Sequence, residues 1–283
     1  MRIAAVLHDA SSDHDGAPLL PTLALERDGA VYGAAALARA LSVSMDFDFH
    51  EAVVALGGAS LRELDERVRS GERPSSARLL PGTFTWLPPC DTERAAYVIC
   101  AEAAAARRDE PAFRLGSARA FSGHEATVPC DVAGGEVGFV GGVAAVLGDD
   151  LFRATAGEAD EAILGFTLVL EWTGGLGAQL GPVLVTREEI RTITGLRAQI
   201  RAGGAPLDAC ELDAGPFAPA EAIAWTSHHL PLRAGDVIRV AWVRAAHAPR
   251  VALGTRVDVA VEKLGRLSGK PCRGPEMRAW RRL

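Results

Sequence analysis

Aromatic side chains and cysteines are both scarce in this chain of 283 residues. Phe, Trp and Tyr together make up 6% of it, and its five cysteines are widely scattered with no Cys-x-x-Cys pair. This pattern argues against a disulfide scaffold and against a structural zinc site. Reduced thiols are typical of an intracellular protein, so we predict a cytoplasmic location.

The chain also lacks an excess of positive charge and a long hydrophobic run. Its formal net charge is −6, whereas binding to nucleic acid needs a basic surface. The longest apolar run, Val137 to Gly148, is shorter than the roughly 20 residues of a membrane-spanning helix. His8 and Asp9 interrupt the first apolar run before the core of a signal peptide could form. We therefore expect no nucleic-acid partner, no membrane span and no export.

The sequence does contain enough apolar residues for a large core. Hydrophobic residues make up 48% of it, which allows one large domain with or without a small N-terminal addition. The best internal boundary is the Pro-Ser-Ser segment at Pro74. We predict a small N-terminal region of hairpin and helix over residues 1–75, a core over residues 76–270 and a basic C-terminal tail over residues 271–283.

Local patterns predict several elements of the N-terminal region. Residues 2–8 alternate as a strand, and residues 23–32 are typical of a hairpin with a tight turn. Ser60 and Glu63 are spaced as a capping box for a helix that ends near Gly71.

The stretch from Val128 to Pro182 predicts a strand, a helix and a second strand around one buried site. A glycine-rich apolar run is followed by a capped amphipathic helix and by an apolar run that ends at Glu171-Trp172. Three short motifs follow in order: Val146-Leu147-Gly148, Gly165-Phe166-Thr167 and Leu180-Gly181-Pro182. Their order resembles the catalytic core of the fumarylacetoacetate hydrolase family, in which the last motif is a turn.

This resemblance implies both a fold and a chemistry. The fold would be α+β and mainly β, a mixed β-sandwich or roll with short flanking helices, and the protein would be a homodimer. Family members hydrolyse, decarboxylate or isomerise oxo acids through a metal-bound enolate. A fold alone does not confer such a reaction, so the residues at the site decide.

The resemblance indicates that the metal ligands are not kept. In the family, magnesium is held by three carboxylates, two of them one residue apart on a strand, where both point to the same face. The corresponding positions here are Val140, Gly142 and Glu171, and only the last has a carboxylate. A hard divalent cation takes about six or more oxygen ligands, so we predict no metal at this site. A buried Glu171 would then be protonated, paired with an arginine or turned to solvent.

The water-activating His-x-x-Glu motif of the family is altered as well. Tyr97 is matched, but Cys100 stands at the histidine position and Glu102 lies one place early. A thiol does not shuttle protons as imidazole does unless its pKa is depressed, and we expect Cys100 to pack inside an alanine-rich helix. His124 lies in a loop and can face the site, although a histidine in a loop is more often solvated.

Two other motifs are weaker. The spacing of the glycines from Gly174 to Gly181 does not fit a dinucleotide-binding loop, and Pro182 follows where a helix should start. His228 and His229 are adjacent, so they would not easily share a metal ion on a strand, and we expect a solvated turn there.

Three functions follow from these observations. The first is a divergent family member that has lost the magnesium-dependent reaction and keeps the scaffold, with the capacity to bind a small oxo acid. The second is an active hydrolase, decarboxylase or isomerase with a rebuilt site of Glu171, Glu102, Cys100 and His124. Only this second function would need magnesium. The third is a structural partner of an active paralogue.

Overall fold

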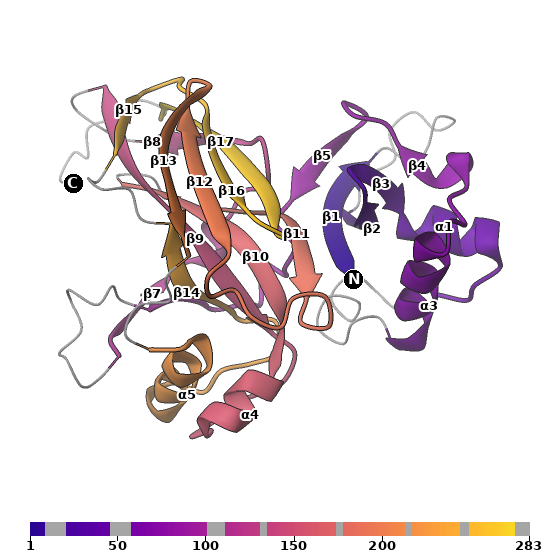
Figure 1. Cartoon of the computed structure of the whole chain (residues 1–283), viewed down its shortest axis with the longest axis horizontal. Coiled ribbons are helices and arrows are strands. Elements are labelled where there is room, and N and C mark those ends of the chain that lie inside the picture. Colours follow the sequence, from indigo (N-terminus) through magenta and orange to yellow (C-terminus); the bar gives the residue numbers. More distant parts are fainter. Residues whose placement is uncertain are drawn as a thin grey trace, which may run out of the picture.

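The computed structural model describes residues 1–8, 21–45, 58–100, 111–130, 135–173, 178–212, 217–243 and 249–274. Within these residues the chain forms two β-sheets with a few short helices at their margins (Figure 1). Most strand pairs are antiparallel, while β14 with β6 and β17 with β8 are parallel. The predicted α+β fold, mainly β with short flanking helices, is confirmed.

The larger sheet contains the buried apolar runs of the chain. Its strands are β1 (Arg2–His8), β2 (Pro21–Arg27), β3 (Ala30–Gly33), β4 (Arg78–Leu79), β5 (Phe84–Leu87), β6 (Tyr97–Cys100), β7 (Phe113–Gly116), β9 (Glu136–Leu147), β10 (Ile163–Trp172), β11 (Ala178–Thr186), β14 (Val237–Val243) and β15 (Arg250–Ala252). They are joined in the order β4-β3-β2-β1-β11-β10-β9-β14-β6-β7, and β5 and β15 pair with β1 and β9.

The smaller sheet packs against the larger one. Its strands are β8 (Thr127–Cys130), β12 (Arg197–Ala202), β13 (Ala205–Glu211), β16 (Val257–Val261) and β17 (Gly265–Arg273), in the order β13-β12-β16-β17-β8. Val143, Leu168 and Val259 belong to the apolar core between the sheets. Gly141 permits this close approach, because a Cβ atom there would lie 2.9 Å from the Cγ2 of Val259.

The helices lie at two ends of the molecule. The helices α1 (Ala34–Leu41) and α3 (Gly58–Arg69) accompany the N-terminal strands, whereas α4 (Ala156–Glu161) and α5 (Pro219–His229) lie together at the other end (Figure 1). Two 3₁₀ turns, Ser75–Ala77 and Ala118–Ala120, complete the helical elements of the described residues. No helix in these described ranges is long and apolar enough to cross a membrane.

The order β9, α4, β10 confirms the predicted strand, helix and strand. Thr155 and Glu158 form the cap of α4: the Thr155 Oγ1 accepts a hydrogen bond from the Glu158 N–H, and the Glu158 carboxylate accepts one from the Thr155 N–H at 2.7 Å. This box satisfies N–H groups that have no partner inside the first helical turn.

The N-terminal patterns are confirmed except for one cap. The hairpin of β2 and β3 turns at Asp28-Gly29, both with positive φ, as tight hairpin turns require. The apolar residues of α3 are buried as expected, and Gly71 follows the helix with a φ of +101°. The capping box at Ser60 is wrong, because α3 already begins at Gly58 and Ser60 lies inside it.

The motif Leu180-Gly181-Pro182 does not form a turn. It lies within β11, which is paired on one side with β1 and on the other with β10. The pairing register of β10 and β11 shifts here, between Phe166 and Leu168, and Gly181 has a φ of +117°. The motif therefore makes an irregularity inside a strand, where glycine tolerates a conformation that other residues avoid.

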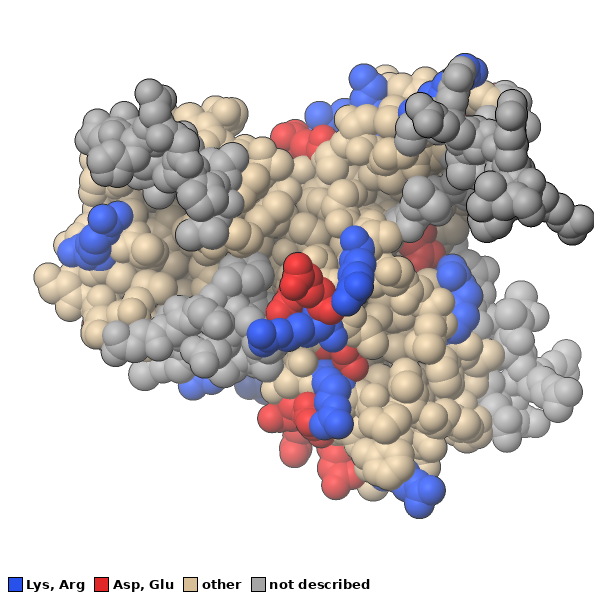
Figure 2. Space-filling view, turned by 180° about the vertical axis from the view of Figure 1, so that it is seen from behind, with Lys and Arg blue, Asp and Glu red and all other residues tan. Residues whose placement is uncertain are grey.

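One face of the molecule has charged side chains of both signs. On the face shown in Figure 2, acidic and basic residues lie next to one another in the middle of the molecule, and most of the rest of this face is uncharged. The described part of this face has no continuous basic surface of the kind that phosphate backbones require.

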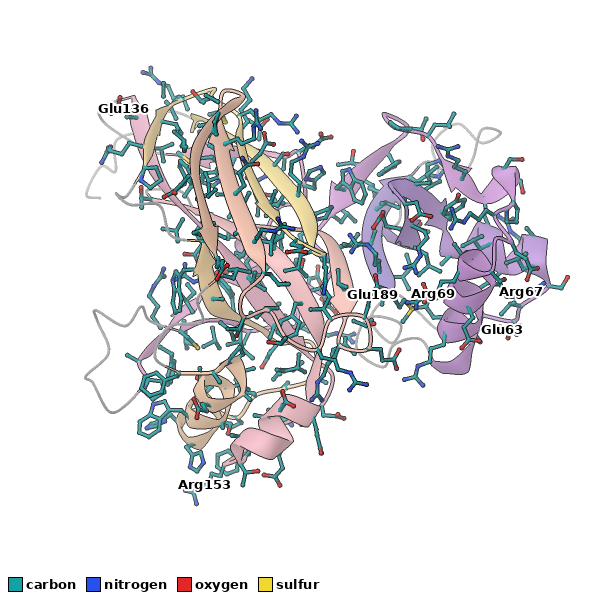
Figure 3. All side chains as sticks on the ribbon, viewed as in Figure 1. Glu63, Arg67, Arg69, Glu136, Arg153 and Glu189 are labelled. Atoms are coloured by element: carbon teal, nitrogen blue, oxygen red, sulfur yellow. The ribbon has the colours of Figure 1, made fainter. Side chains whose placement is uncertain are left out.

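The N-terminal region is joined to the core through strand pairing and ion pairs. β1 pairs antiparallel with β11, so the strands of residues 1–75 continue the sheet of the core. Arg69 of α3 and Arg27 of β2 both pair with Glu189, which follows β11, at 2.9 and 3.4 Å (Figure 3). The division at residue 75 stays a prediction. At the other end, residues 271–273 are part of β17, and residues 275–283 of the predicted tail lie outside the described residues.

Gln179 is a buried polar residue that connects four segments. Its Oε1 accepts a hydrogen bond from the Trp172 Nε1–H at 3.0 Å. Its amide nitrogen lies 3.1 to 3.2 Å from the carbonyl oxygens of Gly123, Ala126 and Ser268, so its two N–H groups donate to all three with one hydrogen shared between two of them. Gly269 leaves room for this amide, because a Cβ atom there would lie 1.7 Å from Oε1. Gln179 thus holds β10, β11, β17 and the turn at residues 123–126 together.

Replacing Gln179 by alanine should lower the free energy of unfolding by about 3 kcal/mol or more, because several buried polar groups lose their partner at once. Chemical denaturation measures this change. Gln199 of β12 is a matched control, and its replacement by alanine should cost about 0.5 kcal/mol or less. Equal losses in the two variants would show that Gln179 has no such connecting role.

Candidate functional site

Glu171 lies near the end of β10, directly opposite Val140 of β9. Gly142 is two residues further along β9 and pairs with Val169. Because residues opposite each other in an antiparallel pair share a face of the sheet, Val140, Gly142 and Glu171 all lie on one face. The structure therefore brings together the three positions that the sequence resemblance pointed to.

Arg239 enters this face from β14, the other neighbour of β9, where it pairs with Ala144. Its side chain passes over Gly142, since a Cβ atom on Gly142 would lie 3.4 Å from the Arg239 Cδ and 2.5 Å from the carbonyl oxygen of Ala241. The Nη1 of Arg239 donates a hydrogen bond to the Oε2 of Glu171. The side chain of Arg239 is 6% exposed and that of Glu171 is 14% exposed, so this is a largely buried ion pair.

Tyr97 and Arg114 complete the surroundings of Glu171. The Tyr97 hydroxyl donates a hydrogen bond to the Oε1 of Glu171, and its ring packs edge-on against Phe121 with the centroids 4.7 Å apart. Burial, together with the charge of Glu171, raises the pKa of Tyr97 well above its ordinary value, so the hydroxyl stays a neutral donor. The Nη2 of Arg114 lies 3.6 Å from the Oε2 of Glu171 at the exposed side of the cluster.

The cluster has more positive than negative charge. One carboxylate, Glu171, faces two guanidinium groups, those of Arg239 and Arg114. In the described residues, the Arg239 Nε and the Trp242 Nε1 are buried donors without a hydrogen-bond partner. The Cζ of Arg239 lies 5.2 Å from the centre of the Trp242 ring, a cation–π contact. The arrangement is suited to an anion rather than to a cation.

The residues at this site do not fit a magnesium ion. Val140 and Gly142 have no oxygen ligand, and both oxygens of Glu171 accept hydrogen bonds from Tyr97 and Arg239. The guanidinium beside the carboxylate would also repel a divalent cation. Within the ranges that the structure describes, no group of three or more His, Cys, Asp or Glu residues could hold a metal ion. Of the three states expected for Glu171, pairing with an arginine is the one found.

Sequence reasoning missed Arg239. One signal could have indicated it. The seven residues of β14 are all buried, and Arg239 is the one charged residue among them. A charged residue in such a run needs a partner of opposite charge, since burying an unpaired charge is costly. The identity of that partner depends on the pairing of β14 with β9, which the local sequence does not indicate.

Cys100 is buried in a strand, and the prediction that it packs inside a helix is wrong. It is the last residue of β6, which pairs with β14 and β7. Burial raises the pKa of the Cys100 thiol to about 11, so the thiol remains protonated at neutral pH and is no substitute for an imidazole base. Glu102 lies outside the described residues.

His124 is largely buried, so the expectation of a solvated loop histidine is wrong. Its Nδ1 accepts a hydrogen bond from the Ser268 N–H at 3.0 Å, and its ring packs edge-on against Trp86 with the centroids 5.5 Å apart. Burial lowers the pKa of His124 to about 4. No hydrogen bond or ion pair among the described residues joins His124 to Glu171.

His228 and His229 form the end of α5, and the expectation of a turn is wrong. They are the last two residues of the helix that begins at Pro219. The Nε2 of His228 lies 3.2 Å from the carbonyl oxygen of Ala154, and the Nδ1 of His229 lies 3.0 Å from that of Trp225.

The Glu171–Arg239 pair can be tested with a double-mutant cycle. Arg239→Met should lower the free energy of unfolding by about 3 to 5 kcal/mol, because it leaves a buried carboxylate unpaired. The double variant Glu171→Leu/Arg239→Met should be more stable than the Arg239→Met variant, since it removes both charges. Additive losses measured by denaturation would contradict a direct pairing of the two side chains.

The buried His124 predicts a loss of stability in mild acid. A histidine whose folded-state pKa is lowered binds protons more readily when the chain is unfolded, so stability is complete above pH 6.5 and falls as the pH drops toward about 4. In His124→Asn, whose amide oxygen can accept the Ser268 N–H but does not titrate in this range, this part of the loss should disappear. Denaturation from pH 7.5 to 4.5 compares the two proteins, and parallel curves would show that His124 is not responsible.

A family model and several solved structures are similar to this chain. Residues 90–270 match the family model for the fumarylacetoacetate (FAA) hydrolase C-terminal domain. A search of curated protein sequences finds no match. Among solved structures, the chain is similar to a fumarylacetoacetate hydrolase from Exiguobacterium antarcticum, with a TM-score of 0.73 and 16% identity over 97% of this chain and 100% of that one.

Two further structures have the same fold. The maleylpyruvate hydrolase from Sphingobium sp. SYK-6, in complex with manganese(II) ion and pyruvate, has a TM-score of 0.70 and 16% identity over 97% of this chain and 100% of that one. The 5-carboxymethyl-2-hydroxymuconate delta-isomerase from Mycobacterium smegmatis has a TM-score of 0.65 and 16% identity over 96% and 100%. At this level of identity the similarity establishes the fold and leaves the reaction open.

Proposed function

Since the chain belongs to the fumarylacetoacetate hydrolase family, we propose that it keeps the scaffold, lacks the magnesium-dependent reaction and binds a small oxo acid at the Glu171–Arg239 cluster. The observation that carries this proposal is the position of Arg239. Its guanidinium pairs with the one carboxylate left at the family's metal-ligand positions, and its side chain passes over Gly142, another of those positions.

A guanidinium replaces some properties of a divalent cation and not others. It supplies a permanent positive charge that balances the Glu171 carboxylate in a buried place. It has no open coordination position, so it does not bind and activate an oxygen as a metal ion does. It does have several N–H donors, which suit a carboxylate. The replacement therefore favours binding of an acid over its activation.

One exposed arginine and two unpaired donors of the cluster favour binding of an acidic ligand. Arg114 is 65% exposed and lies at the outer side of Glu171, where a ligand can reach it from solvent. The unpaired Arg239 Nε and Trp242 Nε1 are two further donors in the same cluster. Pyruvate, which the maleylpyruvate hydrolase structure contains, is a small oxo acid with the right charge and serves as the probe.

The test is calorimetric titration of pyruvate in the presence of a metal chelator. We expect binding that does not require a metal, that is unchanged by added magnesium and that weakens about tenfold in Arg114→Ala, because a charged hydrogen-bond partner is lost. Arg197→Ala is the matched control, since Arg197 is also exposed but lies on β12. It should bind pyruvate as the unmodified chain does.

Two results would contradict the proposal. One is pyruvate binding that requires magnesium or manganese. The other is hydrolysis of an acylpyruvate on addition of magnesium, which would support the alternative of an active enzyme with a rebuilt site. Light scattering on the same samples tests the homodimer, which we propose from the family resemblance alone.

A further inference from the structure

A separate hollow lies between α5 and the start of α4, at the end of the molecule where these two helices lie together (Figure 1). Its volume is about 610 Å³, within the range of small-molecule sites. One wall is a face of α5, where Glu221, Trp225, His228 and His229 lie at spacings of three and four residues. The opposite wall is formed by residues 154–156. None of these residues belongs to the Glu171 cluster.

The side chains with rings give the hollow an aromatic lining. Phe217, Trp225, His228 and His229 all line it. The Trp225 and His229 rings have their centroids 4.9 Å apart, and Phe113 supports His229 from β7 with the centroids 6.1 Å apart. Rings held in this way present flat, apolar surfaces on which a planar aromatic ligand can stack.

The polar groups of the hollow are left as hydrogen-bond acceptors. A carbonyl oxygen only accepts, so the His228 Nε2 donates to Ala154 and the His229 Nδ1 donates to Trp225. In a neutral imidazole the second nitrogen has no hydrogen, which leaves the His228 Nδ1 and the His229 Nε2 as acceptors. Glu221 uses its Oε2 to accept the Ala218 N–H at 2.8 Å, and its Oε1 is a third acceptor.

From this geometry we propose that the hollow between α4 and α5 is a second ligand site, which takes a planar aromatic molecule with hydrogen-bond donors, a phenol or an aromatic amine. Three acceptors, one of them a carboxylate, disfavour an aromatic anion at the same place. The hollow would thus select ligands with hydrogen-bond donors, whereas the Glu171 cluster would select anions. The proposal for the hollow does not rest on the function proposed for the cluster.

The sharpest test compares two ligands with the same phenol ring. Tyramine has an ammonium group on its side chain and 4-hydroxyphenylacetate has a carboxylate. In ligand-observed NMR and calorimetry at a pH of about 8, we expect tyramine to bind at least about tenfold more tightly. Equal affinities, tighter binding of the acid, or no binding of tyramine at millimolar concentrations would overturn the proposal.

Two variants locate the binding. His229→Phe keeps a ring at this position and removes the acceptor, so it should weaken tyramine binding about fivefold, the loss of one hydrogen bond. Arg114→Ala changes the Glu171 cluster only and should leave tyramine binding as it is. His229 is exposed at the end of its helix, so the fold should not depend on it. Unchanged binding in His229→Phe, or a loss in Arg114→Ala that matches it, would show that tyramine does not bind in the hollow.

Discussion

A buried ion pair between Glu171 and Arg239 determines what the central site of this protein can do. Charges in a protein interior need compensation, and in this family the compensation for carboxylates at these positions is expected from a metal ion. Here the compensating charge is part of the chain itself and comes from β14, the strand next to β9. Gly142 leaves room beside Arg239, because a Cβ atom there would lie 2.5 Å from the carbonyl oxygen of Ala241 and already in contact with the Arg239 Cδ at 3.4 Å.

The contacts that join the two sheets lie apart from the Glu171–Arg239 pair. The two sheets are held by apolar residues on the faces they share, and the turn at residues 123–126 is held by Gln179 from within. Neither set of contacts includes Glu171, Arg239 or Arg114. The residues of this site can therefore differ between proteins that share the fold, which is consistent with solved structures that have this fold at 16% identity.

The sequence indicated the elements whose signals are local. Strand alternation, the tight turn of the first hairpin and the capped helix between β9 and β10 each depend on a few adjacent residues, and the structure contains all of them. Two local signals were nevertheless wrong, the capping box at Ser60 and the turn at His228-His229. The other wrong predictions concern residues whose surroundings come from distant segments. Cys100 lies next to an alanine-rich segment that suggests a helix, but pairing with β14 places it in a strand.

The same holds for His124 and for the site itself. His124 is buried by Trp86 and by Ser268 of β17, neither of which its own loop reveals. The lack of a carboxylate at positions 140 and 142 could be read from the sequence, because it needs only a comparison of motifs. The gain of Arg239 could not be, because it requires knowing that β14 lies beside β9.

We propose that Arg239 stands in place of the metal ion, and anomalous diffraction from crystals soaked with manganese tests this most directly. The predicted result is a map with no manganese peak at Glu171 and with the Arg239 guanidinium in contact with the Glu171 carboxylate. A manganese peak bound to Glu171 beside Val140, with Arg239 turned away from it, would contradict the proposal that an arginine takes the place of the metal ion.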